Sequence, residues 1–148
     1  MTALHLAGPE DAERLDPMVA AFHVEQGIDR DAPSRAASIA PLLAGSPHGV
    51  AYLIGPARAP IGYLVISFGW SLEFGGLDGF LDEIWIRPGV RGRGIGTEVL
   101  TALPKALAEA GLTALHLEAR RGDEQLERFY RKLRFEPRPD YMLMSRRF

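Results

Sequence analysis

The segment Arg91-Gly92-Arg93-Gly94-Ile95-Gly96 joins an apolar, strand-like run at 80–86 to a run with helical periodicity at 97–110. A glycine-rich turn from a strand into a helix exposes backbone N–H groups at the positive end of the helix dipole. Glycines let a ligand approach the main chain closely, and arginines add charge-assisted hydrogen-bond donors. The segment is therefore predicted to bind phosphate.

The spacing of these glycines disfavours two common nucleotide-binding motifs. A dinucleotide fingerprint requires G-x-G-x-x-G, whereas the glycines here follow G-x-G-x-G. A P-loop ends in Gly-Lys-Ser/Thr, whereas Gly96 is followed by Thr97-Glu98. The pattern that remains is Arg-x-x-Gly-x-Gly, formed by Arg91, Gly94 and Gly96.

Four segments together resemble one known family. In chain order they are Ile84-Trp85-Ile86-Arg87-Pro88, the run from Arg91 to Gly96, Leu115-His116-Leu117-Glu118, and 128–135 with its Phe129-Tyr130-Arg131-Lys132 core. Their order and spacing resemble strand four, the pyrophosphate loop, strand five and the last helix of the GNAT superfamily of acetyl-CoA-dependent N-acetyltransferases. The resemblance runs from about Ile61 to the C-terminus.

This resemblance implies a single domain over residues 1–148 with a three-layer α/β fold. It implies a mixed sheet of about seven strands flanked by about four helices. In the family, strands four and five run parallel but splay apart at one end, and the acetyl-pantetheine arm enters the gap. The implied acetyl-CoA ligands are Ile84, Trp85, Ile86, Arg91, Gly92, Arg93, Gly94, Ile95, Gly96, Thr97 and Asp123.

Asp82 and Glu83 are adjacent acids within an otherwise apolar strand, where burial is costly unless the acids are paired or hydrated. Strand alternation places them on opposite faces, although a bulge, common here in the family, could change that. Polyamine-type members carry a Glu-Asp pair at these positions, in the reverse order. Either carboxylate could bind an ammonium group and accept its proton. We expect Glu83 to act, because its side chain is longer, with Asp82 as the alternative.

Tyr130 matches the family tyrosine whose hydroxyl faces the sulfur of the coenzyme, so it is the expected acid for the leaving thiolate. Two neighbouring positions depart from the family pattern. Asp123 stands where many members carry an asparagine that binds pantetheine, so it either binds through an oxygen or only caps the last helix. Arg134 replaces a glycine, so the turn after that helix lacks the freedom of glycine at positive φ.

Composition limits the remaining chemistry. The chain contains no cysteine, which excludes disulfides and an acyl-cysteine intermediate, and its four histidines share no metal-ligand spacing. A net charge of −2 argues against nucleic acid as a partner. No apolar run approaches the length of a membrane span, so a cytoplasmic protein without a membrane partner is expected. The family resemblance suggests a homodimer.

The leading functional hypothesis is an enzyme that transfers an acetyl group from acetyl-CoA to a primary amine of a small molecule or peptide. Without a cysteine, the amine would attack directly in a ternary complex. The alternative is a catalytically silent acyl-CoA-binding sensor or interaction module, which would not need Asp82, Glu83 or Tyr130. The acceptor is expected between the first two helices and the 69–79 segment, whose suggestive side chains are Phe22, Glu25, Trp70, Glu73 and Phe74.

The periodicity predicts the following elements. Strands are expected at 3–6, 50–54, 61–68, 80–86 and 114–119, with two short ones near Phe135 and at 141–145. Helices are expected after Gly8-Pro9, at 31–43, at 97–110 and after Asp123. Pro17 should kink or divide the first helix, and Pro104 should kink the third. The 69–79 segment is either a wide hairpin loop or a pair of strand extensions.

Overall fold

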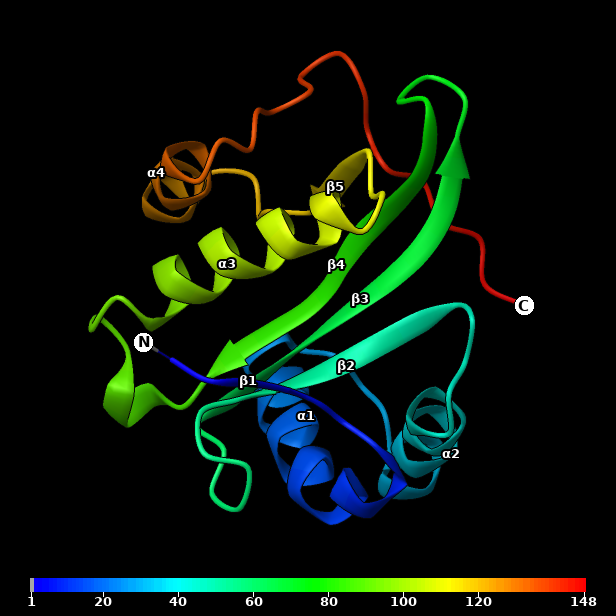
Figure 1. The fold of residues 1–148 in the computed structure, drawn as a ribbon, viewed down its shortest axis with the longest axis vertical. Coiled ribbons are helices and arrows are strands. Elements are labelled where there is room, and N and C mark those ends of the chain that lie inside the picture. The colour runs from blue at the N-terminus through cyan, green and yellow to red at the C-terminus, as the bar shows by residue number, and fades with distance from the viewer. Residues whose placement is uncertain (1) are drawn as a thin grey trace. The chain divides into compact units, whose positions relative to one another are not determined.

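The computed structural model describes residues 2–148, which divide into a first unit ending at Glu118 and a second unit, Ala119–Phe148 (Figure 1). The strands of the first unit are β1 (Leu4–Leu6), β2 (Gly49–Ile54), β3 (Gly62–Ser71), β4 (Gly76–Ile86) and β5 (Ala114–Leu117). Its α-helices are α1 (Ala12–Gln26), α2 (Ala32–Leu43) and α3 (Ile95–Glu109), with short 3-10 turns at Pro9–Asp11 and Pro88–Val90. The second unit contains α4 (Glu124–Lys132).

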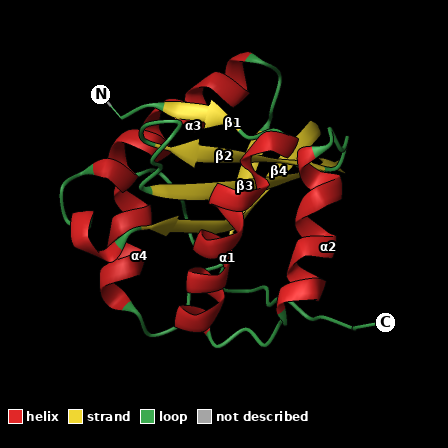
Figure 2. Ribbon diagram, turned by 90° about the horizontal axis from the view of Figure 1, so that it is seen from below, coloured by secondary structure: helices red, strands yellow, loops and turns green. Residues whose placement is uncertain are grey.

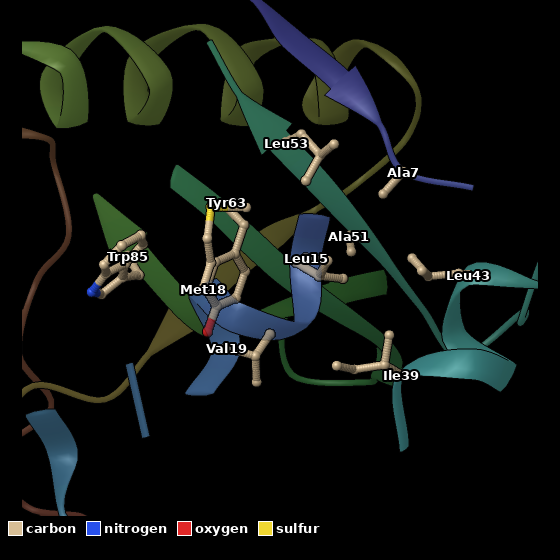
Figure 3. Close-up of a cluster of buried hydrophobic side chains, with 10 residues drawn as sticks. All are labelled: Ala7, Leu15, Met18, Val19, Ile39, Leu43, Ala51, Leu53, Tyr63 and Trp85. Atoms are coloured by element: carbon tan, nitrogen blue, oxygen red, sulfur yellow. The ribbon is translucent and has the colours of Figure 1, made fainter. Parts of the chain in front are cut away.

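The five strands form one mixed sheet in the order β1-β2-β3-β4-β5. The first four strands pair antiparallel with their neighbours, and β4 pairs parallel with β5 after the α3 crossover. Helices α1 and α2 cover one face of the sheet, where Figure 2 shows them lying in front of the strands. Their buried side chains meet those of the sheet in one cluster, shown in Figure 3: Ala7, Leu15, Met18, Val19, Ile39, Leu43, Ala51, Leu53, Tyr63 and Trp85.

Both faces of the central strands are buried. Tyr63 of β3 belongs to the cluster beneath α1 and α2, while its neighbour Leu64 is equally buried outside that cluster. Successive side chains of a strand point to opposite faces, so Leu64 lies on the face away from α1 and α2. Helix α3 supplies its own buried stripe, which consists of Val99, Leu100 and Leu103. The result is a layered α/β arrangement.

Local sequence signals explain where the first helices begin and end. Leu15, Met18 and Val19 share the buried stripe of α1, and Gly27, directly after the helix, adopts the left-handed region with φ of +68°. The Asp31 side chain caps α2 by accepting a hydrogen bond of 2.8 Å from the Ser34 N–H. The predicted helix at 31–43 is therefore confirmed to within one residue.

Three of the described α-helices contain an internal proline, and none is divided by it: Pro41 lies inside a continuous α2. Pro17 lies inside a continuous α1 and Pro104 inside a continuous α3. Each proline removes one backbone hydrogen bond, which tertiary packing of the buried stripe offsets. The expectation of an unbroken third helix is confirmed, and the alternative of a divided first helix is wrong.

The prediction of about seven strands is wrong, because the described residues form five. The segments near Phe135 and at 141–145 are irregular, and the side chains from Tyr141 to Met144 are largely exposed. An apolar strand is stable only when another strand satisfies its backbone groups, and these segments have no such partner. Of the two alternatives for the 69–79 segment, the structure forms the strand extensions. They lengthen β3 and β4 and leave a tight turn at 72–75.

Close contact between β3 and β4 at Gly62 yields a test of the fold. A Cβ atom on Gly62 would overlap the Trp85 carbonyl oxygen, which belongs to the backbone and cannot rotate away. We expect Gly62→Ala to lower the free energy of unfolding by about 1–3 kcal/mol, measured by urea denaturation. Gly89→Ala is the control, because no heavy atom lies within 4 Å of its added Cβ. Equal stability of the two variants would contradict the close approach of β3 to β4.

Candidate active site

A β-bulge in β4 places the two adjacent acids. The β3–β4 register pairs Ile66 with Leu81 and Val65 with Glu83, which leaves Asp82 without a partner on β3. One extra residue in a strand interrupts the alternation of its side chains. Asp82 and Glu83 accordingly line the same cleft, although strict alternation would have placed them on opposite faces.

This cleft lies on the face of the sheet that carries α1 and α2, and its volume is about 370 Å³. Buried apolar side chains of both helices form part of its wall, including Leu15, Val19 and Ile39. Its size falls within the usual range for small-molecule sites, as does the combination of apolar walls with a few polar groups. The polar and charged lining residues are His23, Arg30, Arg35, Ser38, Ser46, His48, Ser67, Asp82 and Glu83.

Two side chains hold the carboxyl group of Glu83. The Tyr63 hydroxyl donates to Glu83 Oε1 at 2.7 Å, and His23 Nε2 lies 2.7 Å from Glu83 Oε2. The side chains of His23 and Glu83 are only 13% and 15% exposed, so water competes weakly for these contacts. Burial and the charges of Glu83, Asp82 and Glu25 raise the pKa of Tyr63, so its hydroxyl remains a donor.

His23 also carries a buried atom without a partner. Its Nδ1 forms no hydrogen bond within the part of the chain that the structure describes. A histidine that donates from Nε2 to a carboxylate keeps an unshared electron pair on Nδ1 when the ring is neutral. The ring of His23 is therefore held in one orientation by its contact with Glu83.

Asp82 differs from Glu83 in its surroundings. It is exposed to solvent, and within residues 2–148 no hydrogen bond to its side chain is formed. The protein around its carboxyl group still removes hydration, and this desolvation raises its pKa, together with the charges of Glu83 and Glu118. His23 acts in the opposite direction and less strongly. The bulge thus presents the carboxyl group of Glu83, which is held by two hydrogen bonds, and that of Asp82, which accepts none from the residues that the structure describes.

The second half of β4 has an open edge. Pairing with β5 ends at Leu81 and Leu117, so residues 83–86 pair only with β3 (Figure 1). The Arg87 N–H donates to the Ile61 carbonyl at 2.7 Å, and hydrogen-bonded pairs alternate along an antiparallel ladder. The backbone groups of Ile84 and Ile86 consequently face away from β3. Pairing between the two parallel strands stops where β5 ends, and the expected splaying of these strands stays a prediction.

The glycine-rich segment forms the turn between β4 and α3. Gly92 and Gly94 adopt φ of +77° and +82°, a region that residues with a Cβ rarely occupy. Helix α3 begins at Ile95, directly after Gly94, and no side chain caps it. The N–H groups of its first turn, from Ile95 to Thr97, have no intrahelical acceptor and point out of the helix end. This geometry fits an anionic ligand.

Arg91 lies in the predicted phosphate loop, but its guanidinium group contacts protein. It donates to both carboxylate oxygens of Glu25 at 2.8 and 3.0 Å, and its Nε donates to the Ile86 carbonyl at 2.7 Å. Glu25 also accepts from the indole N–H of Trp85 at 3.0 Å. The three side chains connect the end of α1 to β4 and to the loop, while Arg93 stays exposed.

The second unit holds the two other predicted site residues. Asp123 caps α4 by accepting from the Leu126 N–H at 3.1 Å, which agrees with its expected capping role. Tyr130 is buried, its ring stacks edge-on against Phe135, and burial raises its pKa. Arg134 adopts φ of +71°, the region that a glycine would favour, at a cost of about 1–2 kcal/mol.

His23 and Tyr63 were not among the site residues predicted from the sequence. The only signal for His23 was its position four residues after Val19 on the α1 stripe, which equally suits a core histidine. The acceptor side chains that were proposed instead do not line the cleft: Phe22, Glu25, Trp70, Glu73 and Phe74. Trp70 and Phe74 lie at the β3–β4 turn, and Glu25 binds Arg91.

Neither a metal site nor a membrane span is visible between residues 2 and 148. Within that range, no three histidine or acidic side chains converge as metal ligands would. None of the helices described there has both the length and the apolar character needed to cross a bilayer.

The raised pKa of Asp82 predicts how the stability of the protein varies with pH. A carboxyl group with a raised pKa in the folded state stabilises the fold below its ordinary value of 3.8, and this contribution is lost as the pH rises through the raised value. Asp82→Asn cannot ionise, so it should be more stable than the wild type at pH 7. This advantage should shrink as the pH falls towards 4, measured by urea denaturation.

Asp29→Asn is the matched control, because it removes one acid from the exposed connection between α1 and α2. We expect this variant to differ little from the wild type at either pH. A stability difference for Asp82→Asn that does not depend on pH would contradict the desolvated environment of Asp82.

Solved structures similar to the chain agree on its fold. A protein of Arthrobacter sp. FB24 assigned as an acetyltransferase is 29% identical, with a TM-score of 0.79 over 99% of this chain and 95% of that one. An integron cassette protein from the mobile metagenome of Cole Harbour Salt Marsh is 27% identical, with a TM-score of 0.81 over 97% and 89%. The ribosomal-protein-alanine N-acetyltransferase of Brucella melitensis biovar Abortus 2308 is 20% identical, with a TM-score of 0.77 over the whole of both chains.

No curated protein sequence matches the chain significantly. Residues 18–135, which make up most of the chain, match the model of the acetyltransferase (GNAT) family. The matched range contains the bulge, the open edge of β4, the glycine-rich turn and Tyr130. With the fold of the solved structures, this match shows that the chain belongs to the GNAT acetyltransferase family.

Proposed function

We propose that the protein transfers an acetyl group from acetyl-CoA to a primary amine, by direct attack in a ternary complex. The observation that carries this proposal is the bulge at Asp82. On one side of the bulge β4 presents an open edge, and at the bulge itself two carboxyl groups line a cleft. A strand that joins an acyl-donor edge to an acid-lined cleft is suited to bring a thioester and an amine together.

The donor would lie along the open edge and the glycine-rich turn. The backbone groups of Ile84 suit the amides of pantetheine, whereas the Ile86 carbonyl already accepts from Arg91. The N–H groups from Ile95 to Thr97 and the exposed Arg93 suit the pyrophosphate. Acetyl-CoA, when bound, supplies the acetyl group as an activated thioester. Arg91 orders the turn through Glu25 and adds positive charge nearby.

The acceptor amine would enter the cleft from the α1 and α2 side. Glu83, held by Tyr63 and His23, offers a fixed negative group for the ammonium form. The ammonium must lose a proton before its nitrogen can form a bond to the acetyl carbon. Glu83 or Asp82 accepts that proton. The raised pKa of Asp82 makes this carboxylate a stronger base, which is what a proton acceptor for an ammonium group requires.

The departing sulfur requires a proton or a hydrogen bond as the carbon–sulfur bond breaks. By resemblance to the family, Tyr130 supplies it. The raised pKa of Tyr130 keeps its hydroxyl protonated at neutral pH, as a donor requires. Two protons leave the nitrogen, one when the ammonium is deprotonated and one as the amide forms. The sulfur gains one proton through Tyr130, which is reprotonated from solvent, so one net proton is released for each acetyl group transferred.

An assay of thiol release from acetyl-CoA with a panel of amines and peptides tests this function. Mass spectrometry of the amine product confirms acetyl transfer as opposed to thioester hydrolysis. If acetyl-CoA binds but no amine in a broad panel stimulates thiol release, the chain is a silent acyl-CoA-binding module. The presence of Asp82, Glu83 and Tyr130 in one family member favours the enzyme.

The glycine-rich turn predicts a specific effect on acetyl-CoA affinity. Gly94→Val would force a side chain into a residue with φ of +82° at the start of α3, which displaces the N–H groups that follow. We expect the dissociation constant for acetyl-CoA to rise about 10- to 100-fold, the cost of one or two charge-assisted hydrogen bonds. Isothermal titration calorimetry measures it.

Gly45→Val is the matched control for Gly94→Val. Gly45 has φ of +96° and, like Gly94, no heavy atom within 4 Å of an added Cβ, but it follows α2. Both variants therefore carry backbone strain of the same kind. Equal affinities for acetyl-CoA in the two folded variants would rule out the turn as the pyrophosphate site.

Neutralising the acid that accepts the proton should change the pH profile of the reaction. For Glu83→Gln or Asp82→Asn, whichever removes that acid, we expect kcat/KM to fall about 10²-fold or more, with its rising limb shifted to higher pH. The physical reason is that solvent must then deprotonate the ammonium. If both single variants and the double variant keep the wild-type rate across the pH range, the two carboxyl groups are structural.

Tyr130→Phe should lower kcat more than it changes the dissociation constant for acetyl-CoA, because the hydroxyl is needed only as the thiolate forms. A loss of about 10²-fold or more is typical of a general acid. Phe129→Leu on the same helix is the control for altered packing. Near wild-type turnover of Tyr130→Phe would assign sulfur protonation to water.

A further inference from the structure

Arg30 is a positive charge in the acceptor cleft that the proposed chemistry does not use. It lies in the exposed connection between α1 and α2, and its guanidinium group donates to the Ser38 hydroxyl at 3.1 Å. Within residues 2–148 it forms no ion pair with a carboxylate. A guanidinium group with one neutral partner keeps most of its five donors available for an anionic ligand.

The other arginine of the cleft is already neutralised. Arg35 forms a two-point ion pair with Asp16, with distances of 2.8 and 3.2 Å, and its side chain is 14% exposed. The charge of Arg35 is therefore balanced within the protein. Among the lining residues that the structure describes, Arg30 is the arginine without an acidic partner, so it is available to pair with an anionic ligand.

Two acids flank Arg30 in the sequence, but they do not balance it inside the cleft. Asp29 and Asp31 are both absent from the cleft wall. The Asp31 carboxylate caps α2 through the Ser34 N–H and is exposed, where charges are screened by water and salt. Asp31 thus moderates the positive potential of Arg30 without occupying its donors.

The cleft combines this cation with acids from a different element. Arg30 comes from the connection that precedes α2, whereas Asp82 and Glu83 come from the bulge of β4. The same cleft also has apolar walls, which include Leu15, Val19 and Ile39. A cationic amine without any other charge would satisfy the acids but would leave Arg30 unpaired.

We propose that the acceptor is an amino acid: an amine that also carries a carboxylate, with an apolar body between or beside them. This inference rests on the proposed acetyl transfer and names its substrate class. The ammonium group pairs with Asp82 and Glu83, the apolar body lies against the α1 and α2 walls, and the carboxylate pairs with Arg30. The product is the N-acetyl amino acid, whose carboxylate is unchanged.

Matched acceptors separate the role of the carboxylate from that of the amine. Leucine is compared with 3-methylbutylamine, and 6-aminohexanoate with hexylamine, because each pair differs mainly by the carboxylate. We expect kcat/KM to be about 3- to 10-fold higher for the better carboxylate-bearing acceptor than for its matched amine, the range of a partly exposed ion pair. Leucine and 6-aminohexanoate also distinguish an α-amine from a distant one.

The variant Arg30→Gln tests the proposed partner directly. It should raise KM for the carboxylate-bearing acceptor about 3- to 10-fold, lower kcat little, and leave the matched amine unaffected. Arg58→Gln is the control, since it removes an exposed arginine from the β2–β3 turn, outside the cleft. Raising the ionic strength should narrow the difference between the matched acceptors in the wild type.

A binding measurement keeps the inference testable without turnover. Saturation-transfer NMR with CoA present should show leucine or 6-aminohexanoate bound to the wild type and weakened by Arg30→Gln. Equal binding and equal kcat/KM for matched acceptors, or equal losses for both in Arg30→Gln, would overturn the substrate class. Acetyl transfer to amines with no preference for a carboxylate would overturn the substrate class and leave the proposed function intact. Binding of an amino acid that depends on Arg30, without acetyl transfer, would contradict only the proposed function.

Discussion

The bulge at Asp82 is the constraint on which the remainder of the site depends. At this residue β4 stops pairing with β5 and changes its register against β3. A continuous ladder would have satisfied the backbone of residues 82–86 on both sides and alternated the two acids between faces. The extra residue interrupts this alternation, so both acids line the same cleft, and the open edge of β4 begins at the same point. Bulges frequently re-aim side chains beside functional sites in this way.

Burying the Glu83 carboxyl group lowers the stability of the fold unless hydrogen bonds compensate for the lost hydration. A carboxyl group that is 15% exposed is costly to bury, and the Tyr63 hydroxyl and His23 ring offset that cost by direct hydrogen bonds. The three residues come from β3, α1 and β4, so the network also fixes how α1 lies on the sheet. Within residues 2–148 the buried His23 Nδ1 has no hydrogen-bond partner, and few buried polar atoms in native proteins lack one.

Glu25 connects α1 to both β4 and the glycine-rich turn. It binds Arg91 of the glycine-rich turn and Trp85 of the strand, and it belongs to the same helix as His23. The helix that lines part of the cleft is thereby tied to the glycine-rich turn. Because the Arg91 and Glu25 side chains are 45% and 37% exposed, this ion pair contributes orientation more than stability.

The sequence by itself determined the local elements and the family. Helical stripes, caps and the glycine-rich turn depend on neighbours within a few residues, so the four α-helices and the strand–turn–helix at 91–97 could be predicted. The two acids could be singled out because acids inside an apolar strand are rare. The absence of strands near Phe135 and at 141–145 could not be predicted, because a strand exists only where another chain segment pairs with it. Tertiary structure alone decided the bulge, the partners of Glu83 and the turning of Arg91 towards Glu25, because each brings together residues about 20 to 66 positions apart, beyond any local pattern.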